Sequence, residues 1–311
     1  MRKKVTIVGA GNTGANTALS IASLDIADVV LIDIVDGLPQ GRALDIAQAG
    51  PWLDFSIAVS GTTDWTDTAD SDVVIITSGV PRKPGMTRED LLGTNANIVR
   101  SVVGNVVQHS PETILMILAN PMDAMCHVAL AASGFPSNRV VGQGGMLDSA
   151  RFRTFLAMGT GTSVKDVNAW VLGGHTEATM VPIISNANIG GVPVSKLLPA
   201  DEVQAIADRA AGGGAEIVEL IKTGSSAVAP AASLRKMVAA ILLDEKRVLP
   251  CCALLSGEYG INDAYVGAPV TLGAGGIEAI HEIELSDTEA ADMKAAGKAV
   301  LELVAQTPAG E

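Results

Sequence analysis

His175 is the histidine best placed for acid–base chemistry. It lies in the run Gly-Gly-His-Thr-Glu at residues 173–177, directly after the apolar segment Asp166–Leu172. If that segment is a strand, the histidine stands in a glycine-flanked loop at its end, where another molecule can approach closely. An imidazole titrates near neutral pH and can therefore give or take a proton. The remaining histidines lack such a setting, and we interpret them as surface or core residues: His109, His127 and His281.

Arginines form a second group that could bind an anion. Arg82 and Arg88 lie in a proline- and glycine-rich segment that follows the apolar run Val73–Thr77. The carboxyl end of such a strand is where ligands bind in open α/β sheets, although a solvated basic loop is the alternative interpretation. Arg151 follows Asp148 by three residues, so on a helix both side chains project from one face.

Residues 9–14, Gly-Ala-Gly-Asn-Thr-Gly, lie between the apolar segment Val5–Val8 and a helix-like stretch. In a Gly-x-Gly-x-x-Gly motif the first glycine permits a tight turn, the second lets a pyrophosphate approach the backbone, and the third lets the helix pack on the sheet. The pyrophosphate then rests on unpaired amides at the positive end of the helix. Asp33 ends the next apolar run, where a carboxylate would bind the adenosine ribose and repel a 2′-phosphate. The pattern predicts a site for NAD rather than NADP, and a plain turn is the alternative.

These residues need a frame, and the first half of the chain alternates short apolar runs with helix-like stretches. The apolar runs predict four buried strands: Val5–Val8, Val29–Asp33, Val73–Thr77 and Thr113–Ala119. The stretches between them predict helices: Thr13–Ser23, Gln40–Gln48 and Thr94–His109. Such alternation is typical of βαβ units and of a parallel sheet covered on both faces.

From about Gly144 the pattern changes, because helix-like segments become longer and strand candidates such as Ala268–Leu272 more dispersed. A long helix is expected over Asp201–Lys222, with an interruption at three consecutive glycines, and a capping box of Ser286 and Glu289 predicts the start of the last helix. We therefore expect an α/β protein of two domains. Residues 1–143 would form a Rossmann-type parallel sheet that binds NAD, and residues 144–311 a C-terminal α+β catalytic domain that binds the substrate.

Composition excludes several other classes. The net charge of −13 argues against a nucleic-acid partner, which requires a surface rich in lysine and arginine. No apolar run approaches the ~18 residues of a membrane span, and the first predicted strand begins too early to leave room for a signal peptide, so we expect a cytoplasmic protein without a membrane partner. The three cysteines fit neither a disulfide framework nor a metal pair, and no metal site is expected. The acidity fits a simple solvated acidic surface, with adaptation to high salt as the alternative.

Five motifs occur in the order found in the lactate/malate dehydrogenase superfamily, and the chain resembles that family from Val5 to the last helix. The motifs are Gly-Ala-Gly-Asn-Thr-Gly at 9–14, Ser-Gly-Val-Pro-Arg-Lys-Pro-Gly-Met-Thr-Arg at 78–88, Ala-Asn-Pro-Met-Asp at 119–123, Leu-Asp-Ser-Ala-Arg at 147–151, and Gly-Gly-His at 173–175. The resemblance implies an NAD-dependent 2-hydroxy-acid dehydrogenase that forms a homodimer or homotetramer.

The resemblance also implies a role for each matching residue. His175 would exchange a proton with the C2 oxygen of the substrate, and Asp148 would orient and stabilise its imidazole. Arg151 would bind the C1 carboxylate through two parallel hydrogen bonds, while Arg88 would polarise the carbonyl and Asn120 would bind the same oxygen or its neighbours. The expected cofactor-binding residues are Gly9, Gly11, Asn12, Thr13, Gly14, Asp33, Asn95 and Asn120.

Arg82 decides which hydroxy acid is expected. Malate-specific members of the family carry arginine at the matching position, whereas lactate-specific members usually carry glutamine. Oxaloacetate has a second carboxylate that is costly to bury unpaired, and a charge-assisted hydrogen bond to it contributes about 1.5–3 kcal/mol. The resemblance therefore favours the malate/oxaloacetate pair, with a lactate or broad-specificity dehydrogenase as the alternative.

One departure lies beside His175. The family usually continues with Gly-Asp and soon Met-Val-Pro, whereas this chain reads Thr176-Glu177-Ala178-Thr179 before Met180, with one residue more. Threonine cannot adopt positive φ as freely as glycine, so the loop is expected to follow a different path. A catalytically inactive NAD-binding sensor is a further alternative, and it would bind NADH without turnover.

Overall fold

The first half of the chain forms six parallel strands with helices between them. The computed structural model describes residues 2–80, 88–222 and 224–308, without the side chain of Arg88. The elements of this half are β1 (Lys3–Val8), α1 (Asn12–Ala22), β2 (Ala27–Ile32), α2 (Leu38–Leu53), β3 (Val59–Thr62), β4 (Val73–Ile76), α3 (Arg88–His109), β5 (Ile114–Ile117), α4 (Met122–Ser133) and β6 (Val140–Gly142).

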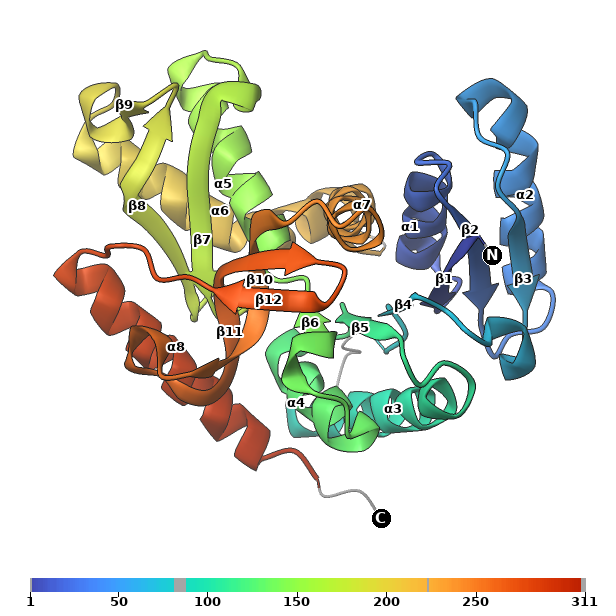
Figure 1. The fold of residues 1–311 in the computed structure, drawn as a ribbon. Helices are drawn as coiled ribbons and strands as arrows, with labels where there is room; N and C mark the ends of the chain where they lie inside the picture. The colour runs from blue at the N-terminus through green and yellow to red at the C-terminus, as the bar shows by residue number, and fades with distance from the viewer. Residues whose placement is uncertain (1, 81–87, 223, 309–311) are drawn as a thin grey trace.

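The second half adds antiparallel strands to the same sheet. Its elements are α5 (Gly145–Thr160), β7 (Val167–Gly173), β8 (Met180–Ile189), β9 (Val192–Pro193), α6 (Ala200–Ile221), α7 (Val228–Leu242), β10 (Arg247–Ser256), β11 (Asn262–Gly273), β12 (Gly276–Ile280) and α8 (Asp287–Ala305). Within the described part of the chain the order across the sheet is β3-β2-β1-β4-β5-β6-β10-β11-β7-β8-β9, and β12 pairs with β11 (Figure 1).

The strand order locates the edge at which a ligand can bind. β1 lies between β2 and β4, and Val8 pairs with both Ile32 and Ile76 at the carboxyl ends of these strands. The chain therefore adds β2 and β3 on one side of β1 and then crosses back to add β4 and β5 on the other side. The crevice at such a switch point is where doubly wound α/β proteins bind their ligands.

Alternate side chains of the strands pack against two layers of helices. Val5 and Ile7 of β1 share a buried cluster with Ile21 of α1 and Met237 of α7. Val8 belongs instead to the cluster of the opposite face, which is covered by α3 and α4. Strands buried on both faces have continuous apolar sequences. For this reason these strands could be predicted from the sequence.

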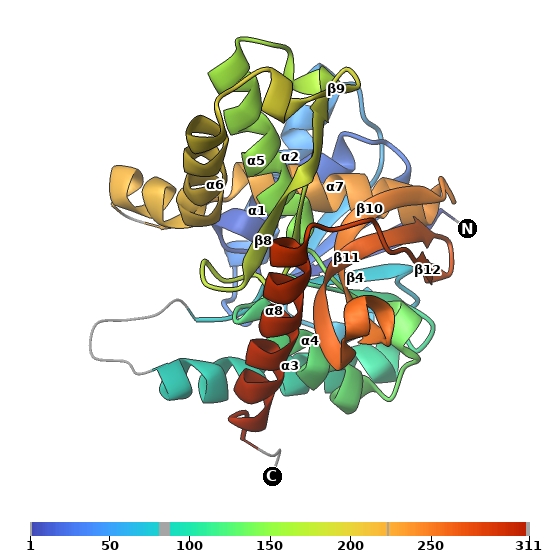
Figure 2. The ribbon, with the colours of Figure 1, turned by 90° about the vertical axis from the view of Figure 1, so that its left-hand side faces the viewer.

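Two smaller clusters complete the second half. One joins α5, α6, β7 and β8, and the two helices lie side by side in both ribbon views (Figures 1 and 2). The other lies beneath α8, which crosses the sheet over β7, β8 and β11 (Figure 2). The three cysteines are free and buried. No described helix combines the length and apolar character needed to cross a membrane.

The expected α/β architecture is confirmed, but three helix predictions need correction. α3 begins at Arg88, well before the expected Thr94. α2 extends from Leu38 to Leu53, well past the expected Gln48. The expected interruption of the long helix is wrong, because α6 runs unbroken through Gly212–Gly214. Each glycine costs a helix about 1 kcal/mol relative to alanine, so tertiary packing must stabilise this stretch.

The predicted capping box of the last helix is present and ties α8 to the sheet. The Ser286 hydroxyl accepts from the Glu289 backbone N–H, and the Glu289 carboxylate accepts from the Ser286 N–H at 2.9 Å. The same carboxylate accepts from the backbone N–H and the hydroxyl of Ser185 on β8. Burial raises the pKa of Glu289, but these hydrogen bonds outweigh burial, and the net shift is downward.

We expect Glu289→Gln to lower the free energy of unfolding at pH 7 by about 1–2 kcal/mol, because a charged acceptor of several hydrogen bonds is lost. Since folding lowers the pKa of Glu289, its contribution is fully present above the ordinary glutamate pKa and is lost as the pH falls from there through the lowered pKa of the folded state. Urea unfolding of both proteins from pH 7 down to about pH 3 should therefore show a difference that shrinks with acidification. A difference independent of pH would contradict this account.

Candidate active site

His175 and Asp148 form a buried acid–base pair. His175 Nδ1 lies 2.7 Å from Asp148 Oδ2, and Arg151 Nη1 donates to the other carboxylate oxygen, Oδ1, at 2.9 Å. The Asp148 side chain is 2% exposed, and those of His175 and Arg151 are each 12% exposed. One carboxylate thus holds an imidazole on one oxygen and a guanidinium on the other, which leaves His175 Nε2 as the nitrogen that can face a substrate.

This arrangement raises the pKa of His175. Burial by itself lowers that pKa, and the positive charge of Arg151 acts in the same direction. The charge and hydrogen bond of Asp148, with a further contribution from the charge of Asp123, outweigh both. The imidazole is therefore held as a proton carrier whose charged form is stabilised by neighbouring carboxylates.

Glycines bring the pair together. Asp148 lies in the first turn of α5, and a Cβ on Gly145 at the start of this helix would lie 2.7 Å from the Pro250 carbonyl oxygen and 2.8 Å from that of Val171. The helix can begin between β7 and β10 only because residue 145 has no side chain. A Cβ on Gly144 would lie 3.7 Å from the His175 Cβ, so the segment after β6 lies directly beside the histidine.

The glycines of α6 make room for Arg151. A Cβ on Gly213 would lie 3.0 Å from Arg151 Cδ, and one on Gly214 would lie 3.2 Å from Nη2. Arg151 Nε is buried and has no hydrogen-bond partner among the described residues. A buried guanidinium with a free donor is suited to bind an anion such as a carboxylate.

The segment from Thr176 to Thr179, which departs from the family pattern, forms a closed loop beside His175. The Thr176 and Thr179 hydroxyls lie 2.7 Å apart, and the Thr176 backbone N–H donates to the Thr179 hydroxyl at 3.2 Å. The Gly174 N–H donates to the Thr179 carbonyl, while the Thr176 carbonyl accepts from Thr179 and Met180. In place of a glycine turn, this chain thus uses a pair of threonine hydroxyls to close the loop that carries the histidine.

The glycine motif fits a dinucleotide. Gly9 has φ +105°, and a Cβ there would lie 2.7 Å from Thr77 Oγ1, whereas a Cβ on Gly14 would collide with the Gly9 carbonyl. A Cβ on Gly11 would meet nothing within 4 Å, so this position is open to solvent and to a ligand. No described side chain caps the start of α1, and its first turn contains no acidic residue. Its unpaired amides are therefore available to a phosphate.

Asp33 follows β2, as expected, and fixes the glycine loop. Its Oδ2 accepts from the Ala10 N–H at 2.7 Å, and its Oδ1 accepts from the Val35 N–H at 3.1 Å. Each carboxylate oxygen has a second lone pair, so this contact leaves acceptors for a ribose hydroxyl.

The two asparagines have different surroundings. Asn95 is buried in α3, where its amide accepts from the Val80 N–H and donates to the Asn120 carbonyl at 2.6 Å. Its polar groups therefore hold the segments after β4 and β5 together. Asn120 is exposed and precedes Pro121 through a cis peptide bond. Arg82 and the side chain of Arg88 lie outside the described residues.

Two residues of this region were not identified from the sequence. Asp123 is buried on α4, and its Oδ2 accepts from the His175 backbone N–H at 2.7 Å. Gln143, immediately after β6, is fully buried, and neither polar atom of its side chain has a partner among the described residues. The Ala-Asn-Pro-Met-Asp motif included Asp123, but no sequence signal linked it to a histidine 52 residues away.

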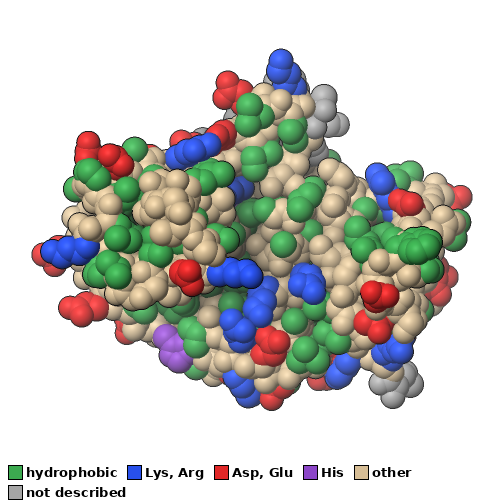
Figure 3. Space-filling model, turned by 90° about the horizontal axis from the view of Figure 1, so that it is seen from above, with side chains coloured by type: hydrophobic (Ala, Val, Ile, Leu, Met, Phe, Trp, Pro, Cys, Tyr) green, Lys and Arg blue, Asp and Glu red, His purple; other side chains and the backbone are tan. Residues whose placement is uncertain are grey.

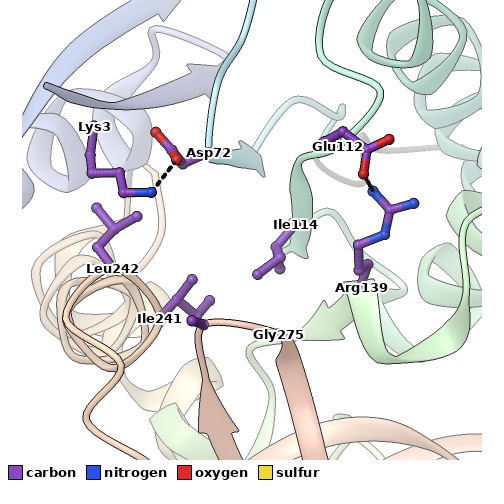
Figure 4. Close-up of a pocket in the computed structure, with 9 residues that line it drawn as sticks. Lys3, Asp72, Glu112, Ile114, Arg139, Ile241, Leu242 and Gly275 are labelled. Atoms are coloured by element: carbon purple, nitrogen blue, oxygen red, sulfur yellow. Dashed lines mark hydrogen bonds and ion pairs between the residues drawn. The ribbon is translucent and has the colours of Figure 1, made fainter. Parts of the chain in front are cut away.

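A hollow at the opposite edge of the sheet has another character. It has a volume of about 170 Å³ and opens at the amino ends of β1 and β5 (Figure 4). Lys3 Nζ is 2.8 Å from Asp72 Oδ1, and Arg139 Nη1 is 3.7 Å from Glu112 Oε2. Its charged groups thus pair with one another, unlike the free donor of Arg151.

Comparisons with known proteins agree along the whole chain. The family described as the lactate/malate dehydrogenase NAD-binding domain matches residues 3–142, and the lactate/malate dehydrogenase alpha/beta C-terminal domain matches residues 145–308. The malate dehydrogenase of Thermomicrobium roseum is 54% identical over 304 residues, 98% of each chain. The solved malate dehydrogenase of Salinibacter ruber has a TM-score of 0.93 at 45% identity over 97% of each chain. A lactate dehydrogenase from Cryptosporidium parvum, complexed with lactic acid and NAD, has a TM-score of 0.94 at 38% identity over 98% of each chain.

We expect Asp148→Asn to lower the pKa of His175, because the variant loses the carboxylate charge but keeps an oxygen for Arg151. NMR titration of the histidine ring protons checks this, with the His175 signal assigned by its loss in His175→Asn. Asp33→Asn is the matched control, since that carboxylate contacts the glycine loop instead. An equal effect of both substitutions would mean that the imidazole does not depend on Asp148.

Proposed function

Since the chain belongs to the lactate/malate dehydrogenase family, we propose that it catalyses the reversible oxidation of (S)-malate by NAD to give oxaloacetate and NADH. The observation that carries this proposal is the His175–Asp148–Arg151 cluster, in which a proton carrier and a buried anion-binding group share one carboxylate. It lies beside the segment after β6, a strand of the same parallel set as β1, whose carboxyl end leads to the glycine loop.

NAD is the cofactor, and bound NAD supplies the nicotinamide that accepts or returns a hydride. The residues that would hold it are Gly9, Gly11, Asn12, Thr13, Gly14, Asp33, Asn95 and Asn120. The open Gly11 and the uncapped start of α1 suit the pyrophosphate, and Asp33 suits an unphosphorylated ribose. Because Asn95 is occupied by main-chain contacts, we infer that it acts by shaping the wall of this cleft.

His175 would exchange a proton with the C2 oxygen of the substrate. In malate oxidation the neutral imidazole takes the proton of the C2 hydroxyl at Nε2, and Asp148 stabilises the imidazolium that results. In the reverse direction the imidazolium returns this proton to the C2 oxygen of oxaloacetate. The raised pKa of His175 favours the charged form, which is the form that reduction requires.

Three further residues would orient the substrate. Arg151 would bind the C1 carboxylate with the donors that Asp148 leaves free, since a guanidinium can form paired hydrogen bonds to a carboxylate. Arg88 would polarise the C2 carbonyl, and Asn120 would donate to the same oxygen or its neighbours.

Arg82 would select the dicarboxylate. A second carboxylate buried without a partner is costly, and a charge-assisted hydrogen bond contributes about 1.5–3 kcal/mol. Pyruvate would leave the guanidinium of Arg82 beside a methyl group. A lactate or broad-specificity dehydrogenase is the second candidate, favoured by the likeness to the Cryptosporidium parvum lactate dehydrogenase, and the sensor alternative predicts NADH binding alone.

The first experiment is NADH oxidation by the purified protein with oxaloacetate and pyruvate compared separately. We expect rapid turnover with oxaloacetate only. Arg82→Gln should reduce the ratio of kcat/KM for oxaloacetate to that for pyruvate by about 10- to 100-fold. Arg42→Gln, on the exposed surface of α2, is the control and should leave the ratio unchanged. Preference for pyruvate in the parent would establish the second candidate, and NADH binding without turnover would establish the sensor.

We also propose that the protein forms a homodimer or homotetramer through a surface that includes α2. This helix exposes Leu44 by 60%, Trp52 by 87% and Leu53 by 47%, and hydrophobic side chains gather over its region at the right of Figure 3. Exposed apolar clusters of this kind mark interaction surfaces.

Trp52→Glu should reduce the molecular mass measured by light scattering, because burial of a carboxylate at an apolar contact is unfavourable. Gln108→Glu, at an exposed position on α3 and away from the proposed surface, provides a charge-matched control that should keep the mass of the parent. A monomeric parent at micromolar concentration would contradict the proposal.

We place this enzyme in the cytoplasm and in the tricarboxylic acid cycle, in which malate and oxaloacetate are interconverted. The free, buried cysteines support a reducing compartment. Cell fractionation checks the location, and recovery of the activity with the membrane or secreted fraction would contradict it.

A further inference from the structure

A second carboxylate, that of Asp123, contacts the backbone of His175. Asp123 is the second residue of α4 and is 3% exposed. Its Oδ2 accepts from the His175 N–H at 2.7 Å, and its Oδ1 lies 3.5 Å from the thiol of Cys252 on β10. In the described part of the chain no lysine or arginine forms a salt bridge with it. The carboxyl group is thus buried with a peptide N–H and a thiol as its partners.

Asp123 carries a cost that a neutral residue would avoid. Burial raises its pKa to about 6, even though the His175 N–H and the imidazole act in the opposite direction. The surrounding positions of α4 are apolar and buried, among them Met122, Ala124 and Cys126. A carboxylate in such a place lowers the stability of the fold at neutral pH. A group that is kept at this cost is a candidate for a functional role.

The hydrogen bond between Asp123 and the His175 backbone is closely packed by its neighbours. A Cβ on Gly174 would lie 3.2 Å from Asp123 Oδ2 and would collide with the Thr179 side chain on the other side. The peptide that carries His175 is therefore held between α4 and the loop closed by Thr176 and Thr179. Asp148 fixes the ring of the same histidine, so backbone and side chain are each held by a carboxylate.

We propose that Asp123 is a positioning residue for His175: one oxygen fixes the peptide that carries the imidazole, and its charge lies beside the ring as a second anion. The role in turnover rests on the function proposed above. Asp123 acts through His175 and need not touch the substrate. Its charge is one of the contributions that raise the pKa of His175 against burial and against Arg151.

The charged and titratable groups around Asp123 come from four elements. Cys252 lies on β10, Cys126 on α4, Asp148 on α5, and His175 in the loop after β7. Burial raises the pKa of the Cys252 thiol well above its ordinary value, so this thiol stays protonated. The charges of Asp123 and His175 each shift the pKa of the other group, so the two titrate as a linked pair.

The experiment uses Asp123→Asn, which keeps an acceptor for the His175 N–H and removes the charge. NMR titration of the His175 ring should give a lower pKa than in the parent. Because reduction requires the imidazolium, the fall in the rate of oxaloacetate reduction on the alkaline side of the pH profile should begin at a lower pH. Glu289→Gln removes another buried carboxylate, on α8, and should leave the pKa of His175 unchanged. An unchanged pKa in Asp123→Asn would overturn the proposal.

Stability separates this role from a merely structural one. Because folding raises the pKa of Asp123, its ionised form opposes folding above about pH 6. Asp123→Asn should therefore melt at the same or a higher temperature than the parent at pH 8, whereas a lower Tm with an unchanged pH profile would assign Asp123 to the scaffold alone and overturn the proposal.

Asp123→Ala removes the acceptor as well. We expect a loss of about 100-fold in kcat from displacement of the imidazole, with the Kd of NADH retained, and full kcat in this variant would also overturn the proposal. The NMR titration needs no substrate. Absence of oxaloacetate turnover in the parent would thus contradict the proposed function while the titration still decides the role of Asp123.

Discussion

The carboxylate of Asp148 is the interaction on which the candidate site depends. Two groups that can both be cationic, the His175 imidazole and the Arg151 guanidinium, meet on its two oxygens. Without an anion between them they would repel each other, and neither could keep its place in a site with little water. The carboxylate in turn can be buried only because both of its oxygens are bonded. The positions of His175 and Arg151 and the protonation of the imidazole therefore all depend on their contacts with Asp148.

The rest of the fold brings this triad together from distant parts of the chain. α5 can start between β7 and β10 because Gly145 leaves the Val171 and Pro250 carbonyls room, and this start places Asp148 at the end of β7. The single sheet joins β1, which ends at the glycine loop, to β7, which ends at the histidine. The glycine loop and the candidate acid–base pair are thus supported by one sheet.

Much of this could be predicted from the sequence, for identifiable reasons. β1, β2, β4 and β5 are buried on both faces, so each reads as an unbroken apolar run, and the glycine motif depends on neighbours within a few residues. β3 was missed because its sequence, Val-Ser-Gly-Thr, has only one strongly apolar residue. Contacts between residues far apart in the sequence could not be predicted either, because they produce no local sequence pattern. The Asp123–His175 contact spans 52 residues. The glycines of α6 suggest an interruption of the helix, and only the structure shows that Arg151 packs against them.

That last contact has a consequence for the interpretation of variants. In α6 the glycines contribute no side chains where the helix faces α5, and the stem and guanidinium of Arg151 occupy the space instead. The arginine thus completes the packing of a helix on which it does not lie. Replacement of Arg151 by alanine would remove the proposed carboxylate-binding group and open a void beside α6 in one step. The resulting loss of rate would combine recognition with folding, and kinetics alone could not separate the two.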